Sequence, residues 1–479
     1  MSALDMTPQG ASGRDSVAQS GAGQGGAGGV PEGTTLLSRQ QAQAIADRAL
    51  KMSAADQTRV TIVSSRGGNT RFADASISTS GAVEDTAVTI TATVGRRRAS
   101  ATTNVLDDAS LRRTVDMAAR LARLAPEDPE LMPELGAQTH ANVPAFVART
   151  ADLDPEARAA AVRRAVESAN TAGKAAGPLF SAGFLEANAR VVAVATSAGL
   201  FAYHRTTDAG FSMTARTADG TGSGWAGSGA RDWAALDPAS VGRIAAQKAV
   251  ASRSPQAIEP GLYTAVLEPQ AVNDLVPLLA GALSARTADE GRSPFSKPGG
   301  GTRVGEKVMD ERVTLYSDPA DPQLLGQPFD NDGLPLSRVV WIEKGVLRNL
   351  AYSRFWAQKQ GKQPTGNGLA GGLALTGGTK STEELVAGCE RGILVTHFFY
   401  IRSLEPRTVL QTGLTRDGTF LIEKGKITRA LKNFRWNESP LLMLNRLEDI
   451  GRAELTAAGR IMPALRVSRF DFSSSSDAV

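Results

Sequence analysis

Residues that bind zinc or close disulfides are scarce in this chain. Its 479 residues include three histidines and one cysteine, which are His140, His204, His397 and Cys389. No two of these residues stand at a metal-ligand spacing such as H-x-x-x-H or C-x-x-C, so the sequence offers no self-contained zinc site. A single cysteine also excludes a disulfide within the chain and is typical of a protein from a reducing compartment.

Long apolar runs and a strong net charge are absent as well. No stretch approaches the ~20 apolar residues that cross a bilayer, and the first residues lack the basic and apolar regions of a secretory signal. We therefore expect a cytoplasmic protein with no membrane partner. The 53 basic and 49 acidic residues give a net charge of +4. The densest basic cluster, residues 96–98, is interpreted as a solvated strand end rather than a nucleic-acid footprint, so no nucleic-acid partner is expected.

The length of the chain predicts two domains, because a single hydrophobic core stops growing at roughly 250 to 300 residues. Residues 1–33 are rich in Gly, Ser, Ala and Gln and have almost no large apolar side chain. Such a segment buries too little surface to offset its ordering entropy, which predicts a disordered tail. After it we expect an N-terminal α+β domain over 34–253, a C-terminal mainly β domain over 254–473 and a short tail over 474–479.

The N-terminal domain is predicted to be a mixed sheet with helices. Apolar residues at helical spacing predict helices over 38–54, 107–124, 154–173 and 238–252. Alternating or β-branched runs predict strands over 60–63, 70–79, 87–94, 179–186, 190–197, 201–206 and 211–217. Turn chemistry is expected at 65–68 and a flexible loop at 220–229. His140 falls in a Pro-rich surface connection over 126–144 and is interpreted as a solvated loop histidine rather than a ligand.

The C-terminal domain is predicted to be mostly antiparallel sheet. Short strands alternate with Gly-rich turns, a pattern that is typical of a strongly bent or barrel-like sheet. One helix is expected over 271–289, after Pro269, and a last one over 437–451. The predicted fold class is therefore α+β with two domains.

Five sequence words, taken together, are similar to the TldD/PmbA family of zinc metallopeptidases and their partner subunits. The words are GNTRFA at 68–73, PTGNG at 364–368, GILVTHFFYIRS at 392–403, LTRDGTFLIE at 414–423 and NFRW at 433–436. The resemblance spans both expected domains, from about Leu37 to Phe472.

The resemblance implies a cytoplasmic, heterodimeric protease of prokaryotes that acts on unfolded polypeptides or peptides. A TldD-like subunit carries an H-E-x-x-x-H helix: two histidines and a further ligand hold zinc, and the glutamate takes a proton from the attacking water. A PmbA-like (TldE-like) subunit lacks this helix. In the present chain the matching segment, 273–284, reads NDLVPLLAGALS, with Asp274 as its only carboxylate. The chain thus resembles the PmbA-like subunit, with no metal, cofactor or catalytic residues expected of its own and zinc expected in a TldD-like partner.

Two other interpretations stay open: an active hydrolase with non-standard residues near Glu290, and a non-proteolytic binding or scaffold protein. Whether this chain alone is an enzyme is therefore left open. Asp289 and Glu290 are weak catalytic candidates, which are also explained as a charge-satisfied helix end. Cys389 and His397 could pair as nucleophile and base, but a buried, inert cysteine also fits. The Gly-rich segment 366–372 is interpreted as a flexible loop bordering a cleft.

His397, Phe398, Tyr400 and Arg402 are the candidate substrate-binding residues. A regular strand over 393–402 would place Phe398, Tyr400 and Arg402 on one face and His397 on the other. Because both faces carry bulky groups, we expect one face to pack in the core and the other to line a cleft where an extended peptide adds to the sheet. A strand buried on both faces is the alternative. The sequence leaves open the physiological substrate, the stoichiometry and whether the chain also forms homodimers.

Overall fold

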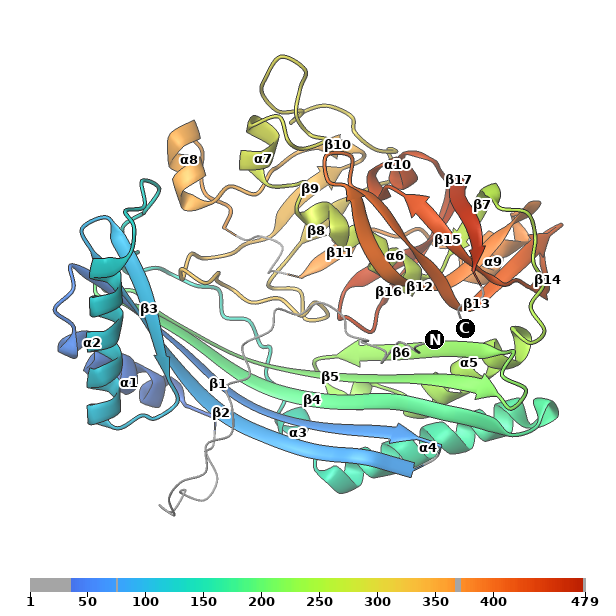
Figure 1. Ribbon diagram of the computed structural model, residues 1–479, viewed down its shortest axis with the longest axis horizontal. Helices are drawn as coiled ribbons and strands as arrows, with labels where there is room; N and C mark the ends of the chain where they lie inside the picture. The colour runs from blue at the N-terminus through green and yellow to red at the C-terminus, as the bar shows by residue number, and fades with distance from the viewer. Residues whose placement is uncertain (1–35, 75, 367–371, 477–479) are drawn as a thin grey trace, which may run out of the picture. The chain divides into compact units, whose positions relative to one another are not determined.

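The computed structural model describes residues 36–74, 76–366 and 372–476. Within these residues the fold is α+β and contains two separate sheets, as the sequence predicts (Figure 1). One sheet has six strands, in the order β3-β2-β1-β4-β5-β6, and is built from the first half of the chain. The other has eleven strands and is built from the second half. The predicted tail over 1–33 lies outside the described residues.

The six-stranded sheet is antiparallel throughout. Four of its strands are long, with 17 to 19 residues each. Its strands are β1 (Gln57–Ala73), β2 (Ser76–Val94), β3 (Arg97–Thr103), β4 (Leu179–Thr196), β5 (Phe201–Thr217) and β6 (Ser223–Ala230). The short strands expected from the sequence are therefore joined into longer ones, and the expected loop over 220–229 contains most of strand β6.

Gly68 shows why the expected turn at 65–68 is wrong. Strand β1 runs straight through this segment, with Gly67 opposite Val83 and Gly68 opposite Ala82. A Cβ atom on Gly68 would lie 2.3 Å from Nη1 of Arg158, a buried residue of helix α4. The glycine is thus explained by the close approach of a guanidinium group to the strand.

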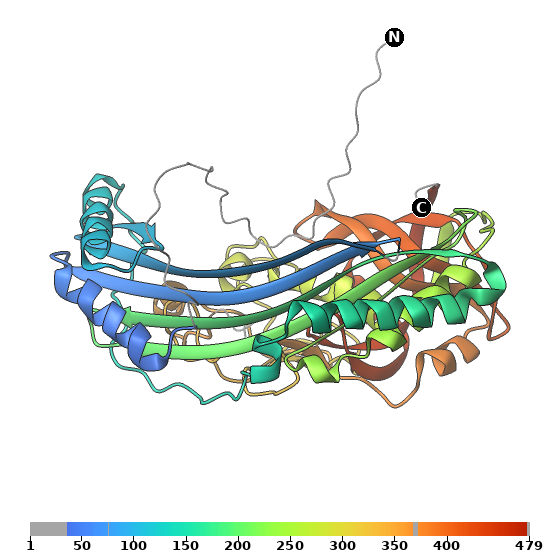
Figure 2. The ribbon, with the colours of Figure 1, turned by 90° about the horizontal axis from the view of Figure 1, so that it is seen from below.

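Helices cover one face of this sheet; Figure 2 shows α1 and α4 in front of it. The long helices are α1 (Arg39–Met52), α2 (Asp108–Leu124), α4 (Pro155–Gly173) and α5 (Pro238–Ala251), and the short ones are α3 (Ala148–Ala151), η1 (Lys174–Ala176) and η2 (Trp233–Ala235). Each long helix begins after a side chain that accepts a backbone N–H at its start: Ser38, Asp107, Asp154 and Asp237. Such caps fix helix starts, and these four predicted helices are confirmed.

The eleven-stranded sheet is mostly antiparallel and strongly bent, as predicted. Strands β7, β12, β13, β15 and β17 form a ring of hydrogen-bonded neighbours, since β17 pairs back with β7. The strands are β7 (Gly261–Leu267), β8 (Leu315–Ser317), β9 (Val339–Glu343), β10 (Val346–Leu347), β11 (Leu373–Leu375), β12 (Arg391–Glu405), β13 (Leu410–Glu423), β14 (Lys426–Ala430), β15 (Asn433–Glu438), β16 (Leu447–Leu455) and β17 (Ile461–Ser476). Strand β17 continues three residues beyond the expected boundary at 473.

The helix expected over 271–289 is divided into three pieces. They are α6 (Pro269–Leu275), the 3₁₀ turn η3 (Val276–Ala280) and α7 (Ala285–Asp289). Pro277 lacks a backbone N–H and Gly281 follows η3, which accounts for the interruption. The remaining short helices are α8 (Arg354–Gln360), α9 (Thr382–Ala387) and α10 (Pro440–Asn445). The helix expected over 437–451 is limited to α10 because residues from Leu447 onward pair with β17.

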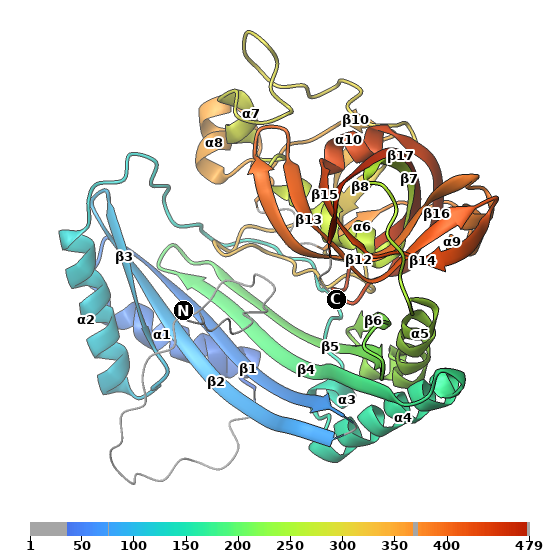
Figure 3. The ribbon, with the colours of Figure 1, turned by 45° about the vertical axis from the view of Figure 1, so that its right-hand side comes forward.

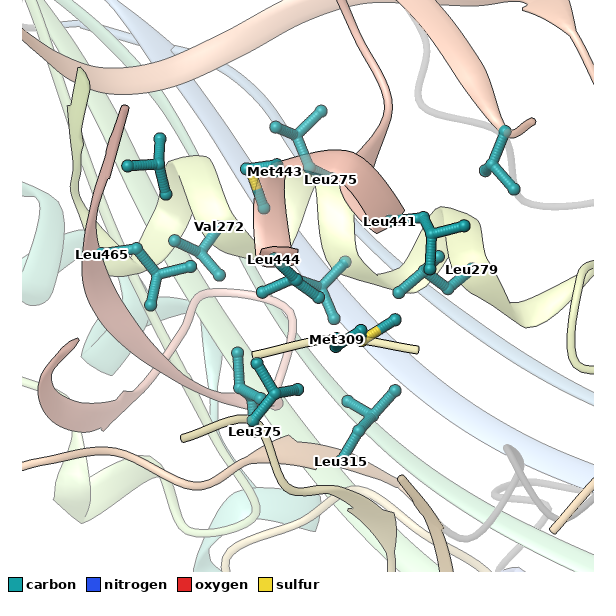
Figure 4. Packing of buried hydrophobic residues seen from close by; sticks show 14 of the residues in the cluster. Val272, Leu275, Leu279, Met309, Leu315, Leu375, Leu441, Met443, Leu444 and Leu465 are labelled. Atoms are coloured by element: carbon teal, nitrogen blue, oxygen red, sulfur yellow. The ribbon is translucent and has the colours of Figure 1, made fainter. Parts of the chain in front are cut away.

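Helix α6 and η3 place their apolar side chains in the main core of the second half of the chain. Val272, Leu275 and Leu279 lie among Met443, Leu444 and Leu465, all of them buried (Figure 4). Helix α6 also contacts strands β12 and β17. Strand β6 of the first sheet contacts strand β13 of the second. Figure 3 shows β6 at the edge of the first sheet that is nearer to the second half of the chain. The residues discussed next lie around this contact.

Candidate functional site

A β-bulge in strand β13 positions the central carboxylate of the site. Val395 of β12 pairs with Thr419 and His397 pairs with Arg416, so Asp417 and Gly418 together stand opposite the single residue Thr396. Asp417 adopts a φ of 55° and Gly418 a φ of 129°. A bulge of this kind re-aims side chains and is frequent next to functional sites.

The bulge turns the Asp417 carboxylate toward both sheets. Oδ1 accepts a hydrogen bond of 2.5 Å from the hydroxyl of Ser223 on β6, and Oδ2 lies 3.8 Å from Nδ1 of His397 on β12. The Asp417 side chain is only 5% exposed. One buried carboxylate thus joins the edge strand of the six-stranded sheet to the wall of the ring.

His397 is held between Asp417 and a ring from the other sheet. The indole of Trp225, on β6, stacks on the imidazole with centroids 5.1 Å apart and planes 19° from parallel. Nδ1 of His397 is buried and makes no hydrogen bond within the described part of the chain. Its distance to Asp417 exceeds hydrogen-bond length, a looseness that is common in unliganded sites.

Helix α6 fixes the strand that carries His397. Asp274 accepts a hydrogen bond of 2.8 Å from the backbone N–H of Phe398 and one of 2.9 Å from Nε2 of Gln270. Burial raises the pKa of Asp274, while the nearby His397 imidazole and these hydrogen bonds act in the opposite direction. The residue next to His397 is therefore tied to the helix by its main chain.

Two cavities meet at Asp417. The first, which we call the His397 cleft, has a volume of about 520 Å³ and contains the imidazole. It is lined by Asp74, Phe180, Ser181, Ala182, Thr214, Arg216, Trp225, His397, Phe399, Arg416 and Asp417. The second, of about 530 Å³, includes Gly418 and Thr419 after the bulge and is lined mainly by hydroxyl groups, glycines and Asn433. Ser223 and Asp417 both line this second cavity.

The His397 cleft combines aromatic rings with guanidinium groups. The Arg416 guanidinium lies over the ring of Phe399, 4.2 Å from its centroid, and 3.8 Å from the Asp417 carboxylate. Phe180 is half exposed at the same cleft. Rings and planar cations offer stacking surfaces and hydrogen-bond donors together. This chemistry suits side chains and carbonyl groups of a polypeptide.

The predicted substrate-binding residues fall in three different environments. His397 lines the cleft, whereas Phe398 is 3% exposed and packs in the core against Phe470 and Trp436. Tyr400 is 54% exposed, and the Arg402 guanidinium lies 4.5 Å from its ring centroid. Neither Tyr400 nor Arg402 lines a described cavity.

The alternation expected along 393–402 is wrong because the strand is irregular. The register with β13 shifts between Phe399 and Arg402, and Tyr400 adopts a φ of 55°. Phe399 and Tyr400 are consequently both exposed although they are neighbours. Phe398 and Tyr400 therefore do not share a face: the Phe398 ring is in the core and the Tyr400 ring is at the surface.

Asp289 and Glu290 lie at the end of α7, away from both cavities. Glu290 forms ion pairs with Arg286 and Arg292, and their hydrogen bonds hold its pKa below the usual range. Asp289 accepts a hydrogen bond of 2.6 Å from the indole N–H of Trp356. These contacts are those of a charge-satisfied helix end, and each carboxylate already has a side-chain partner.

Cys389, His140 and His204 do not line the His397 cleft. Cys389 is buried in an apolar cluster with Leu385 and Ile422, and burial raises the pKa of its thiol, which disfavours the reactive thiolate. His140 bonds the carbonyl of Gly333 at 2.9 Å. His204 is buried near Phe329, and desolvation lowers its pKa to about 4. Most of the loop over 366–372 lies outside the described residues.

Trp225, Ser223 and Asp417 were not predicted as site residues from the sequence. Trp225 and Ser223 lie in the segment expected to be a loop, and their partners are more than a hundred positions away in the chain. The Arg416-Asp417-Gly418 triplet carries the local signal of a bulge, namely an aspartate and a glycine that tolerate positive φ. Within the described residues, no helix is long and apolar enough to cross a membrane.

Family models for three consecutive regions match this chain. They are described as PmbA/TldA metallopeptidase domain 1 (residues 59–122), central domain (147–253) and C-terminal domain (260–474). Together they span most of the sequence and both sheets. The chain belongs to the PmbA/TldD family of metallopeptidase-related proteins.

Curated relatives match over short stretches. A metalloprotease of Archaeoglobus fulgidus is 42% identical over 59 residues, which cover 12% of this chain and 14% of that protein. A metalloprotease TldD homolog of Haemophilus influenzae is 26% identical over 144 residues, which cover 27% of this chain and 29% of that protein. The aligned part is thus less than a third of either relative.

Solved structures match over almost the whole fold. TldE from Thermococcus kodakarensis superposes with a TM-score of 0.78 at 19% identity, covering 90% of this chain and 99% of that one. A candidate modulator of a DNA gyrase from Thermotoga maritima gives a TM-score of 0.78 at 20% identity with the same coverage. At these identities the likeness establishes the fold.

The residues on α6 do not fit the zinc ion that the family name implies. Asp274, the single carboxylate of this helix, is already bonded to Phe398 and Gln270, and His397 is the only imidazole nearby. A catalytic zinc site takes three protein ligands. No group of three or more His, Cys, Asp or Glu side chains suited to a metal occurs in the described ranges. We therefore derive no catalytic step through a metal held by this chain.

Proposed function

We propose that this chain is the non-catalytic, PmbA/TldE-like subunit of a heteromeric cytoplasmic protease and that it binds an extended segment of unfolded polypeptide in the His397 cleft. The zinc ion and the hydrolytic step belong to a TldD-like partner. The observation that carries the proposal concerns two neighbouring elements, helix α6 and strand β12. The helix that matches the zinc helix has no histidine or glutamate, while the strand beside it lines a formed cleft.

The contents of the cleft support a polypeptide ligand. Trp225 and Phe399 offer aromatic faces to side chains, and His397 offers an imidazole whose Nδ1 is directed toward Asp417. A histidine held in this way can exchange hydrogen bonds with a backbone amide or carbonyl group. A cleft that offers aromatic faces together with hydrogen-bonding and charged groups could bind the side chains and backbone of an extended segment.

Metal analysis and peptide hydrolysis test whether zinc and hydrolytic activity require the partner subunit. The chain is purified alone and after co-expression with a family homologue that contains H-E-x-x-x-H. We expect no stoichiometric zinc and no hydrolysis of an unfolded polypeptide with the chain alone, and both with the pair. Stoichiometric zinc that survives dialysis of the single chain, or hydrolysis by it, would contradict the proposal.

Variants of the cleft test its role in the pair. We expect Trp225→Ala and His397→Ala to lower hydrolysis by the pair about tenfold or more while the pair still assembles, since each change removes a stacking or hydrogen-bonding surface. Leu404→Ala is the matched control, because Leu404 is exposed on the same strand and lines no described cavity. Equal turnover in all three variants would place the polypeptide elsewhere.

A further inference from the structure

Two arginine side chains reach the His397 cleft from different sheets. Arg216 belongs to strand β5 and Arg416 to strand β13, and both line the cavity. Arg216 stands opposite Ser223 of the neighbouring strand β6. Ser223 in turn donates a hydrogen bond to Asp417, the residue after Arg416. The two arginines are therefore separated by one strand pairing and one hydrogen-bonded contact between the sheets.

The two-residue alternation of strand β5 directs Arg216 toward the cleft. Met213 and Ala215 are buried in the apolar cluster that includes helices α4 and α5. Neighbouring side chains on a strand point to opposite faces of the sheet. Thr214 and Arg216 therefore lie on the face away from these helices, and both line the cleft. The position of Arg216 is thus set by the main chain of a long, regular strand.

The two acidic residues of the lining do not balance the arginines inside the cleft. The Asp417 side chain is 5% exposed and already accepts the hydroxyl of Ser223, whereas 29% of the Arg416 side chain is exposed. Asp74 follows the end of β1 at an exposed position, where water and salt screen its charge. The surface that a ligand contacts inside the cleft is therefore formed mainly by guanidinium groups, the His397 imidazole and aromatic rings.

An aromatic ring holds the Arg416 guanidinium at the cleft. The carbon of the guanidinium group lies 4.2 Å from the centroid of the Phe399 ring. A stacked guanidinium is planar and pre-organised, so it loses little side-chain freedom when it binds. Its paired N–H groups match the two oxygens of a carboxylate, and such charge-assisted hydrogen bonds are roughly twice as strong as those to a neutral carbonyl group. The cleft is therefore better matched to a carboxylate than to an uncharged peptide group.

We propose that the His397 cleft recognises a carboxylate group of the bound polypeptide and that Arg216 and Arg416 determine this specificity. The carboxylate belongs either to a free C-terminus or to an Asp or Glu side chain, since both present the same pair of oxygens. This specificity rests on the function proposed above, because the polypeptide must enter the cleft. The guanidinium groups donate hydrogen bonds to the carboxylate, while Trp225 and Phe399 contact the neighbouring side chains.

Calorimetric titration of the full chain measures this preference. The probes are N-acetylated, unstructured peptides that share one sequence of Gly, Ser, Thr, Leu and Phe. The first has an amidated C-terminus and no charge, the second has a free C-terminal carboxylate, and the third is amidated and has one central Ser replaced by Glu. We expect one or both of the charged peptides to bind about tenfold more tightly than the neutral one. Added salt should weaken the binding of the charged peptides more, because it screens the ion pair.

Substitutions in the cleft test the two arginines separately, so that a folding defect in one variant leaves the other to decide. In Arg216→Gln and in Arg416→Gln we expect the preference for the charged peptide to fall to about threefold or less, since each variant loses a guanidinium group. Arg190→Gln is the matched control. Arg190 is exposed on the same face of the same sheet, lies roughly 30 Å along β4 from Phe180, and lines no described cavity. Trp225→Ala should lower the affinity of all three peptides by a similar factor and leave the preference unchanged.

The outcomes separate this specificity from the proposed function. Tighter binding of the free-carboxylate peptide alone assigns the cleft to chain ends, tighter binding of the Glu peptide alone assigns it to acidic side chains, and tighter binding of both supports a carboxylate from either source. Equal affinities of all three peptides, or an unchanged preference in both Arg216→Gln and Arg416→Gln, would overturn the carboxylate specificity and leave the proposed function standing. Absence of binding for all three peptides would contradict the proposed function itself, and the specificity with it.

Discussion

The carboxylate of Asp274 accepts a hydrogen bond of 2.8 Å from the backbone N–H of Phe398, which joins helix α6 to strand β12 at the residue after His397. In this family the corresponding helix of a zinc subunit is expected to hold metal ligands. Here its one carboxylate instead holds the main chain of the neighbouring strand. The contact gives α6 a positioning role for the strand that carries His397.

Two substitutions of Asp274 should therefore show how much its hydrogen-bond acceptor contributes to stability. Asp274→Ala leaves the Phe398 N–H without its partner and should lower the free energy of unfolding by about 1 to 3 kcal/mol. Asp274→Asn keeps an acceptor and should cost less. Urea unfolding of the two variants measures the difference, and equal losses would show that the hydrogen bond to Phe398 contributes little.

The same residue gives a pH dependence with a defined sign. The pKa of Asp274 in the folded chain is raised above the ordinary value of 3.8, so folding favours the protonated carboxyl group. The contribution of this preference to the free energy of unfolding is present below pH 3.8 and is lost as the pH rises through the folded pKa. Asp274→Asn has no such titration. The stability difference between Asp274→Asn and the unmodified chain should therefore shift in favour of the variant as the pH rises; a difference that does not change with pH would contradict this.

His204 should make the chain less stable in mild acid. Its folded pKa of about 4 lies below its ordinary value of 6.5 because burial disfavours the imidazolium ion and Arg231 lies nearby. The stabilising contribution is complete above 6.5 and is lost as the pH falls toward 4, by up to about 3 kcal/mol. Unfolding of the unmodified chain and of His204→Gln at pH 7.5 and pH 5 measures this, and the variant should show a smaller loss between the two.

Truncation of Phe398 should destabilise the chain much more than truncation of Tyr400. Phe398→Ala removes a buried ring that stacks on Phe470 and should cost about 3 to 5 kcal/mol. Tyr400→Ala removes an exposed ring and should change stability by less than about 0.5 kcal/mol. Thermal unfolding of both variants measures whether each ring is packed in the core or exposed at the surface. A large loss for Tyr400→Ala would mean that its ring is packed in solution.

Gly418 should not tolerate a side chain. Its φ of 129° is rarely adopted by other residues, and a Cβ atom would lie 3.0 Å from side-chain atoms of Thr396 and Phe420. Gly418→Ala should destabilise the chain by about 1 to 3 kcal/mol and move Asp417 away from His397. The second effect is read from the His397 imidazole resonances in NMR spectra. Unchanged resonances would show that the bulge survives the substitution.

The sequence predicts the helices of the first half well because their caps are local. Ser38, Asp107 and Asp154 each bond a backbone N–H three residues ahead, and such spacings are visible in the sequence. Strand lengths are predicted less well. Glycines such as Gly68 are normally turn residues, and the reason for this one is Arg158, which is distant in the chain.

The candidate site is predicted only in part for the same reason. His397 was identified from its sequence word and does line a cleft, but Trp225 and Ser223 reach it from another sheet. The positions of Phe398 and Tyr400 could not be derived from a two-residue alternation because β12 is irregular between Phe399 and Arg402. Contacts between distant segments and breaks in register decide which side chains meet.

The register of the central strands also bears on how the first half of the chain folds. In the hairpin of β1 and β2 Ala73 pairs with Ser76, and in the hairpin of β4 and β5 Ala195 pairs with Phe201, so each pair of strands joins residues that are close in the chain. The pairing of β1 with β4 joins residues about 110 to 140 positions apart, such as Ala73 with Ala182 and Arg59 with Thr196. Closing so long a loop is entropically costly and slow. The two hairpins should therefore form early, and the docking of β1 against β4 should set the folding rate of this sheet.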